Sequence, residues 1–506
     1  MAPKPILIAG AGPTGLVLAL SLAHRGVAFR LIDKNAGPGE ASRAMAVQAR
    51  TLEFYRQLGF AEEVVAQGME IERVHLRKHG EDVAVIDLSV PGVGVSPYPF
   101  VLSYPQDEHE RFLGEKLAAM GCAIEWNVAL KEFTDEGGQV CAVLDHGGRT
   151  EFAEFSYVCG CDGARSVVRE ALGVGFPGGT YDHEFFVADT RVEGNVGDDL
   201  YGNLSESDFC LMLPIRSNGA KRLIGTIPGE VTAGGGEMTF ERLRPFVERL
   251  LGVRVTQVNW FSTYRVHHRV AAGFRVGRAF LAGDAGHIHS PVGGQGMNTG
   301  IGDAINLAWK LADVVQGRAG ESILDTYESE RIAFARTLVK TTDRVFTVVS
   351  NRGWGGSLFR GFFMPTVAPW LTKAARVRQG MFGMVSQTRI HYPDSPLSEG
   401  EAGRVKGGDR LPWVHMDGAD NFDPLKSLGW QVHVYGELEE EFAAAVRRCG
   451  LQLEAFAWSD VAEAVGLLPR AFYLVRPDGY VALAEEQQSA AKLTDYCSRH
   501  ELRFKA

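Results

Sequence analysis

The chain begins with an apolar run, a glycine-rich stretch and a second apolar run with helical spacing. The run "PILIA" ends at Gly10 and is typical of a buried parallel strand. The segment "LVLALSLAHRG" has helical periodicity and stops at Gly26, which predicts the end of a helix. A second strand, "VAFRLIDKN", reaches Asp33. The pattern therefore predicts a strand, a helix and a second strand in succession.

Three glycines lie where the first strand becomes the helix. Gly10, Gly12 and Gly15 fit the spacing G-x-G-x-x-G, and Pro13 and Thr14 lie between the last two. The first glycine permits a tight turn, the second lets a pyrophosphate approach the backbone, and the third allows close packing of helix on strand. Phosphate would then lie at the helix N-terminus. The alternative is a tight turn without a ligand.

An acid ends the second strand. Asp33 stands eighteen residues after Gly15, where a carboxylate can hydrogen-bond ribose hydroxyls and disfavours a 2′-phosphate. We expect Asp33 and the adjacent Lys34 to belong to a dinucleotide site. NAD and FAD both satisfy this unit.

Two later stretches repeat the change from strand to glycine to helix. "EFSYVCGCDGARSVVREALGV" reads as a strand, then Asp162 and Gly163, then a helix. "RAFLAGDA" reads as a strand that delivers Gly283 and Asp284, and "SPVGGQGMNTG" precedes the helical run "IGDAINLAWKLADVV". The unpaired N–H groups at the start of this last helix would point at a ligand.

These three signatures stand in the order found in the group A flavoprotein monooxygenases, and residues 1 to about 390 resemble that family. Its members are aromatic hydroxylases typified by p-hydroxybenzoate hydroxylase and phenol hydroxylase. The resemblance implies that the dinucleotide is FAD, with NADH or NADPH as reductant and O2 as co-substrate. It also implies hydroxylation of an aromatic, phenolic or polycyclic, substrate through a flavin C4a-hydroperoxide.

The resemblance assigns cofactor-binding roles to residues in each signature. Arg43 would approach the FAD pyrophosphate, and Gln106 and Asp284 would contact the ribityl chain. Asp162 would serve both FAD and the nicotinamide donor. The flavin N1 and C2 carbonyl edge would lie at the start of the last helix, against the stretch that contains Pro291, Gly294, Gly296, Met297 and Asn298. A helix N-terminus there would stabilise the negative charge of reduced flavin.

The rest of the chain predicts an α/β protein, α+β overall, with three domains. Residues 1–180 and 265–390 would form a Rossmann-like FAD-binding domain. Residues 181–264 alternate apolar and polar positions and predict an inserted antiparallel sheet that binds substrate. Residues 391–506 resemble the thioredoxin-like tail of larger family members, but no C-x-x-C occurs, so we expect packing or homodimerisation there.

The predicted substrate sheet carries few polar groups. Met212, Leu213, Leu223 and Ile224 occupy its middle strands and indicate an uncharged or bulky aromatic ligand, although the core of a sheet reads the same way. The phenol-hydroxylase branch has an acid where this chain has Met45. No catalytic base is assigned; four histidines near the flavin stretch are candidates that more often have structural roles: His267, His268, His287 and His289.

Composition excludes several other classes of protein. A net charge of −10 and a pI near 5.8 argue against nucleic-acid and anionic-membrane surfaces. No apolar run reaches the length of a membrane span, and the N-terminus does not read as a signal peptide, so a cytoplasmic protein is expected. Seven cysteines without a C-x-x-C pair favour neither disulfides nor a metal site.

Other activities on the same scaffold stay open at this point. Baeyer-Villiger oxygenation fits the same motifs, and so does a flavin- or ligand-binding protein without turnover. Halogenation is disfavoured because no W-x-W-x-I-P stretch occurs, and disulfide reduction because the first helix carries no cysteine pair.

Overall fold

The first strand, helix and strand form the centre of a parallel sheet, as the sequence predicts. In the computed structural model, β1 (Ile6–Ala9) is followed by α1 (Pro13–His24) and β2 (Phe29–Asp33). The sheet has the order β18-β19-β12-β1-β2-β8, parallel except for β18. Its other strands are β8 (Ile124–Trp126), β12 (Val158–Gly160), β18 (Arg275–Val276) and β19 (Ala279–Leu281). The chain continues from β1 to β2 on one side of the sheet and later adds β12 on the other side of β1. At such a switch point, the carboxyl ends of the strands border a crevice that can hold a ligand.

The structure describes the chain with a few internal gaps. The described residues are 4–39, 44–78, 80–88, 92, 94–203, 209–233, 236–289, 294–350, 382–383, 386–416 and 418–504. Within them, no helix is both long and apolar enough to cross a bilayer.

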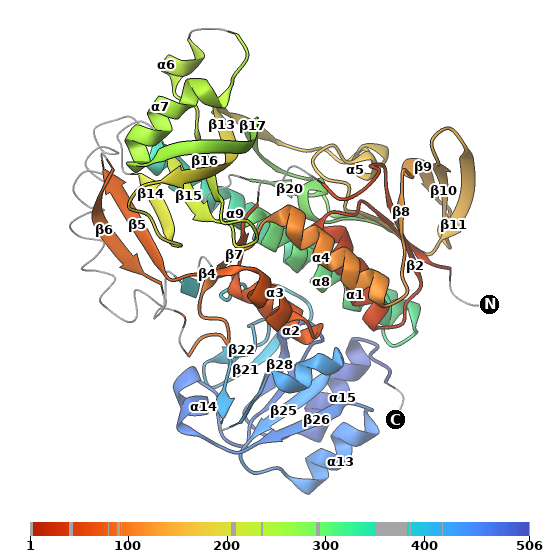
Figure 1. Ribbon diagram of the computed structural model, residues 1–506. Coiled ribbons are helices and arrows are strands. Elements are labelled where there is room, and N and C mark those ends of the chain that lie inside the picture. Colours follow the sequence, from red (N-terminus) through yellow and green to blue (C-terminus); the bar gives the residue numbers. More distant parts are fainter. Residues whose placement is uncertain are drawn as a thin grey trace.

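Helices cover the parallel sheet. α1 packs against α8 (Gly296–Val315), and most residues of both helices are buried, as their nearly continuous apolar sequences predict. α4 (Gln106–Ala119) lies beside α1 (Figure 1). The remaining helical segments of this part are α2 (Ala49–Gln57), α3 (Ala61–Gln67), α5 (Val167–Ala171), η1 (Gly283–Ala285), η2 (Glu321–Leu324) and α9 (Asp325–Ser350). Two small sheets complete it: β3 (Ala46–Val47), β7 (Val101–Ser103) and β4 (Met69–Ile71); and β9 (Ala129–Asp135), β10 (Val140–Asp145) and β11 (Thr150–Phe155).

A second large sheet has eight strands in the order β20-β17-β13-β16-β15-β14-β5-β6. Its pairings are antiparallel except for the parallel pair β14 and β5. α7 (Phe240–Leu251) packs an apolar side against it, and the short α6 (Gly229–Thr232) lies nearby (Figure 1). The strands are β5 (Arg73–Lys78), β6 (Glu81–Asp87), β13 (Gly178–Glu193), β14 (Leu200–Asn203), β15 (Cys210–Pro214), β16 (Lys221–Thr226), β17 (Arg254–Val270) and β20 (His287–Ile288).

This sheet draws on more of the chain than residues 181–264. Figure 1 shows β5 and β6, coloured as an early part of the chain, at the edge of the later strands. The pairing of Val74 with Leu200 places them there. The division of the chain into domains at 180, 265 and 390 stays a prediction.

The C-terminal part forms a third sheet, with the order β22-β21-β28-β27-β25-β26. β25 is parallel to β26 and antiparallel to β27, which is antiparallel to β28. This order, with helices after β25, β26 and β28, matches a thioredoxin-like arrangement. The segments are β21 (Glu399–Ala402), β22 (Val405–Lys406), β23 (His415–Met416), β24 (Ala419–Asp420), η4 (Asp423–Ser427), β25 (Gln431–Tyr435), α13 (Glu440–Arg448), β26 (Gln452–Phe456), α14 (Asp460–Val465), β27 (Phe472–Val475), β28 (Val481–Glu485) and α15 (Ala490–Arg499).

Buried polar contacts join this C-terminal part to the rest of the molecule. The Arg50 guanidinium on α2 donates to the carbonyl oxygen of Asp478 at 2.7 Å, and Trp309 Nε1 on α8 donates to Asp478 Oδ2 at 3.1 Å. Arg410 Nε donates to Glu53 Oε2 at 2.9 Å. The C-terminal part therefore packs directly on α2 and α8. The α/β fold class predicted from the sequence is confirmed.

Candidate active site

The glycines of the first turn have different packing reasons. Gly10 has φ +105°, and a Cβ there would overlap the backbone of Cys161. A Cβ on Gly15 would overlap the carbonyl oxygen of Gly10. Gly12 has φ −75° and nothing within 4 Å of the place where a Cβ would be. Gly10 and Gly15 are thus required by the protein's own packing, whereas Gly12 leaves open space at the mouth of α1.

The N-terminus of α1 is suited to an anion. Gly12 is its N-cap and has no side chain, Pro13 occupies the first turn, and that turn carries no acid. Gly12, Pro13 and Thr14 line a large cavity. Because the first N–H groups of a helix lack intrahelical partners and carry a partial positive charge, a phosphate is stabilised there.

Asp33 lies at the end of β2, but its carboxylate is engaged by the protein. Its Oδ2 accepts the backbone N–H of Ala11 at 2.8 Å, and its Oδ1 accepts that of Asn35 at 2.9 Å. Asp33 therefore stabilises the glycine turn through hydrogen bonds to backbone N–H groups. Neither Asp33 nor the exposed Lys34 is among the described residues that line the cavity. Their predicted contacts with a cofactor stay predictions.

Gln106 begins α4 and lines the cavity. Its Nε2 donates to Glu110 Oε1 at 2.8 Å, and Glu110 Oε2 accepts the N–H of Gly39 at 3.2 Å. Burial raises the pKa of Glu110, although its bonds to Gln106 and Gly39 lower it. Glu110 also lines the cavity, and it is a residue that the sequence analysis did not select. Its position one turn after Gln106 was the available signal.

The turn after β19 presents Asp284. Gly283 has φ +61°, and its N–H donates to Asp303 Oδ2 at 2.9 Å. A Cβ on Gly283 would lie 2.5 Å from Thr14 Oγ1. The next residue, Asp284, is exposed and lines the cavity. The strand and glycine turn thus place Asp284 at the cavity, and its predicted contact with the ribityl chain stays a prediction.

The start of α8 lies at the same cavity. Gly294, with φ +62°, is followed by Gly296 and Met297, and all three line the cavity. α8 begins at Gly296, and its first turn carries no acidic side chain that would oppose the positive end of the helix dipole. This end of α8 can therefore stabilise a negative charge on a ligand.

The Asn298 side chain connects this loop to the segment from Ala46 to Thr51. Its Nδ2 donates to the carbonyl oxygens of Ala46 at 2.8 Å and Gly294 at 2.9 Å. Its Oδ1 accepts the N–H of Gln48 at 2.9 Å and the Thr51 hydroxyl at 2.7 Å. The side-chain amide is fully used in fixing the loop, so any contact of Asn298 with a cofactor falls to its backbone N–H.

Asp162 lies outside the cavity lining among the described residues, although Gly163 and Ala164 belong to it. Asp162 Oδ2 accepts the N–H of Val168 at 3.1 Å at the start of α5. Burial raises the pKa of Asp162, against hydrogen bonds that lower it. Its predicted role toward the nicotinamide stays a prediction. Two further predicted residues, Arg43 and Pro291, lie outside the described residues.

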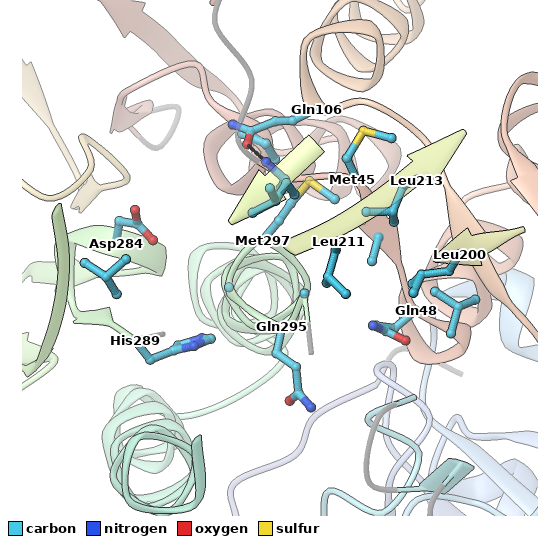
Figure 2. Close-up of a pocket in the computed structure, with 18 of the residues that line it drawn as sticks. Met45, Gln48, Gln106, Leu200, Leu211, Leu213, Asp284, His289, Gln295 and Met297 are labelled. Atoms are coloured by element: carbon cyan, nitrogen blue, oxygen red, sulfur yellow. Dashed lines mark hydrogen bonds between the residues drawn. The ribbon is translucent and has the colours of Figure 1, made fainter. Parts of the chain in front are cut away.

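One cavity of about 740 Å³ joins these elements to the eight-stranded sheet. Figure 2 shows Asp284 and His289 on one side of the end of α8, across from the leucines of the sheet. The apolar part of the lining is formed mainly by Met45, Ile71, Val74, Ile86, Leu88, Phe100, Leu200, Phe209, Leu211, Leu213, Ile224, Val266 and Phe382. Met45 thus places a thioether in the cavity at the position where the resemblance expected an acid.

Only half of the four middle-strand residues noted in the sequence face this cavity. Leu213 and Ile224 line it together with Leu211. Met212 pairs with Leu223, and both pack into the core against α7. Side chains alternate between the two faces of a strand, so neighbours in sequence point opposite ways. For Met212 and Leu223 the alternative that the sequence left open, the core of the sheet, is the one the structure shows.

Two of the four candidate histidines line the cavity, and the other two pack against protein groups. His267 and His289 line the cavity, whereas His268 lies against Tyr181 and His287 against Asp303. Within the described part of the chain, no group of His, Cys, Asp and Glu is arranged to hold a metal ion.

Gly300 on α8 packs closely against Gly283 and Thr14, which the sequence did not indicate. A Cβ on it would lie 3.1 Å from the Cα of Gly283 and would overlap Thr14 Oγ1. η1 and α8 therefore meet through their glycine backbones, and the Thr14 side chain at the start of α1 packs against both.

Comparisons with known proteins agree with this geometry. Residues 4–342 match the model of a family described as FAD binding domain. The chain is 35% identical to 6-methylpretetramide 4-monooxygenase of Streptomyces rimosus, over 97% of this chain and 92% of the relative. It is 32% identical to dialkyldecalin synthase of Streptomyces rugosporus, over 78% of this chain and 83% of the relative. The solved structure of the anhydrotetracycline hydroxylase OxyS from Streptomyces rimosus superposes with a TM-score of 0.76 at 27% identity, covering 98% of each chain.

Proposed function

The chain belongs to the FAD binding domain family and is an FAD-dependent aromatic monooxygenase, and from this premise we propose that its cavity holds the flavin beside a polycyclic phenolic substrate. The observation that carries the proposal is the continuity of the cavity. It runs from Gly12 on α1, past Asp284 and the start of α8, to the apolar face of the eight-stranded sheet.

The residues of the first part of the cavity fit FAD. The open space at Gly12 admits a diphosphate against the N–H groups of α1. Asp284 is exposed in the cavity, where its carboxylate can accept hydrogen bonds from ribityl hydroxyls. The start of α8 places a positive dipole end where the pyrimidine edge of a flavin would carry charge. FAD held there and reduced by NADH or NADPH would supply the electrons that activate O2.

The protein's own residues position the substrate and exclude water. The whole cavity, including the part proposed to hold FAD, has a volume of about 740 Å³. Leucine, isoleucine, valine and phenylalanine side chains dominate the sheet side, which suits a large planar ring system. Arg265, His267 and His289 add polar groups to the cavity lining, and they can orient hydroxyl or carbonyl substituents. We assign no catalytic base among them.

The test compares substrates and one sheet variant. Reduction of FAD by NADH or NADPH should accelerate with polycyclic phenols, with uptake of O2 and a product heavier by one oxygen atom. Leu211→Trp should fill the sheet side and raise KM for such substrates while the FAD dissociation constant stays unchanged. Met212→Leu, on the opposite face of β15, is the matched control and should leave KM as it is. Equal KM values for Leu211→Trp and the wild type would place the substrate elsewhere.

A second candidate function comes from one relative, which is named a synthase, not a monooxygenase. On this alternative the chain binds FAD but releases a product without added oxygen. Product mass separates the two functions, because only a monooxygenase adds one oxygen atom for each NAD(P)H consumed.

Three further expectations stay proposals: the division into an FAD-binding domain, a substrate sheet and a C-terminal domain; a homodimer; and a cytoplasmic location. The packing of the C-terminal part on α2 and α8 supports a structural role for it. Its removal should therefore reduce stability and FAD affinity together.

A further inference from the structure

A buried carboxylate connects the turn that carries Asp284 to α8. Asp303, on α8, has no exposed surface. Its Oδ2 accepts the N–H of Gly283 at 2.9 Å and lies 2.6 Å from His287 Nε2. Its Oδ1 accepts the Arg331 Nε–H at 2.6 Å. These three partners lie on η1, β20 and α9, so a single side chain joins three elements to α8.

Arg331 extends this connection along α8 and into the C-terminal region. Its guanidinium donates to the carbonyl oxygen of Thr299 at 3.0 Å and to the Tyr392 hydroxyl at 2.9 Å. Gln387 Nε2 donates to Thr299 Oγ1 at 2.9 Å. The first turns of α8 are thus held in place by side chains from outside the helix.

The elements that Asp303 joins are closely packed. Gly283 and Gly300 are close enough that a Cβ on Gly300 would lie 3.1 Å from the Gly283 Cα. Because the Gly283 and Gly300 backbones approach each other and the Thr14 side chain packs against both, a shift of η1 against α8 would change how Asp284 lies relative to the start of α8. Both groups line the cavity.

The charge of Asp303 suits a role in fixing geometry. Burial alone would raise the pKa of Asp303, but Arg331 and His287 hold it below its usual range, so the carboxylate is ionised. A buried ion pair contributes little net stability, because the cost of removing two charges from water offsets their attraction. Fixing one arrangement of the surrounding elements is a role that such a pair can fill.

We propose that Asp303 is a positioning residue for the cofactor, which holds the Gly283–Asp284 turn in register with the start of α8. The proposal rests on the proposed function in that the ligand of these two elements is FAD. Asp303 itself is not among the residues that line the cavity, so its effect on FAD passes through Gly283, His287 and Arg331.

The same helix offers a matched control. Asp313 is 1% exposed and accepts hydrogen bonds from Arg318 Nε at 2.9 Å and from Trp430 Nε1 at 3.1 Å. It lies at the opposite end of α8 and is not part of the described cavity lining. Asp313→Asn therefore removes the same charge from the same helix without touching the cofactor turn.

The experiment measures the FAD dissociation constant and the reduction potential of bound flavin in the wild type, Asp303→Asn and Asp313→Asn. Asp303→Asn should weaken FAD binding at least tenfold and shift the potential, because Asp284 and the start of α8 would no longer be held in register around the flavin. Asp313→Asn should change neither, although both variants lose stability. Wild-type values in Asp303→Asn, or equal changes in both variants, would overturn the proposal. A wild-type protein that does not bind FAD would instead overturn the proposed function.

A second pair of variants decides the matter if Asp303→Asn does not fold. His287→Gln keeps an N–H donor that can reach Asp303, whereas His287→Leu removes it. The Gln variant should bind FAD within about twofold of the wild type, and the Leu variant should bind more weakly. Equal FAD dissociation constants in the two variants would contradict the positioning role.

Discussion

Gly12→Ala should separate the needs of the ligand from the needs of the fold. Gly12 has φ −75°, which alanine adopts freely, and no atom lies within 4 Å of the added methyl group. The variant without ligand should be as stable as the wild type, or more stable by about 0.4–1 kcal/mol because the unfolded chain loses entropy. A methyl group in the path of the FAD diphosphate should cost about 1–3 kcal/mol. Binding should then weaken about 5- to 150-fold.

The assay is titration with FAD, followed by quenching of flavin fluorescence, together with thermal unfolding of the FAD-free protein. Gly15→Ala is the control, because its Cβ would overlap the carbonyl oxygen of Gly10 and should destabilise the FAD-free protein itself. FAD binding by Gly12→Ala as tight as that of the wild type would show that no diphosphate lies against Gly12. An equal drop in the melting temperature of the FAD-free protein in both variants would show that Gly12, like Gly15, is required by the fold.

Three further predictions concern charges. Asp284→Ala should weaken FAD by about 1.5–3 kcal/mol through a lost charge-assisted hydrogen bond, whereas Asp162→Ala should mainly lower stability; equal FAD dissociation constants would contradict this. Gln295→Glu, at the start of α8, should lower the flavin potential by about 0.3–2 kcal/mol, or roughly 6–40 mV for two electrons, in redox titrations above pH 7; an unchanged potential with FAD bound would show that the dipole plays no part. Burial lowers the pKa of His109 and of His433 to about 3, so only the unfolded chain gains these protons below about pH 6.5. The free energy of unfolding should therefore fall as the pH drops from about 6.5 toward 3, by up to about 1.4 kcal/mol per pH unit for each histidine. When this free energy is measured by urea titration at several pH values, it should fall less steeply with pH in His433→Gln than in the wild type.

Local patterns in the sequence predicted the centre of the fold. The apolar run before Gly10 and the helical run after it became β1 and α1, because strand, turn and helix are each specified within a few residues. The addition of β5 and β6 to the substrate sheet was not predicted. It depends on a pairing between Val74 and Leu200, which no local pattern reports.

The candidate site shows the same limit. Asp284 and Met297 could be placed from their motifs, and both line the cavity. The side chains of Asp33 and Asn298, in contrast, are occupied by protein groups distant in sequence. Asp303 reads in the sequence as an ordinary polar residue of a helix, and only the meeting of three other elements around it reveals its contacts.

The central claim is that this chain transfers one oxygen atom from O2 to an aromatic ring. The most direct test is turnover of a polycyclic phenol with NADH or NADPH under ¹⁸O2, with the product analysed by mass spectrometry. The account predicts one ¹⁸O atom in the product for each reductant consumed in coupled turnover, and none from ¹⁸O-labelled water. A product that forms without reductant, or that contains no oxygen from O2, would contradict it.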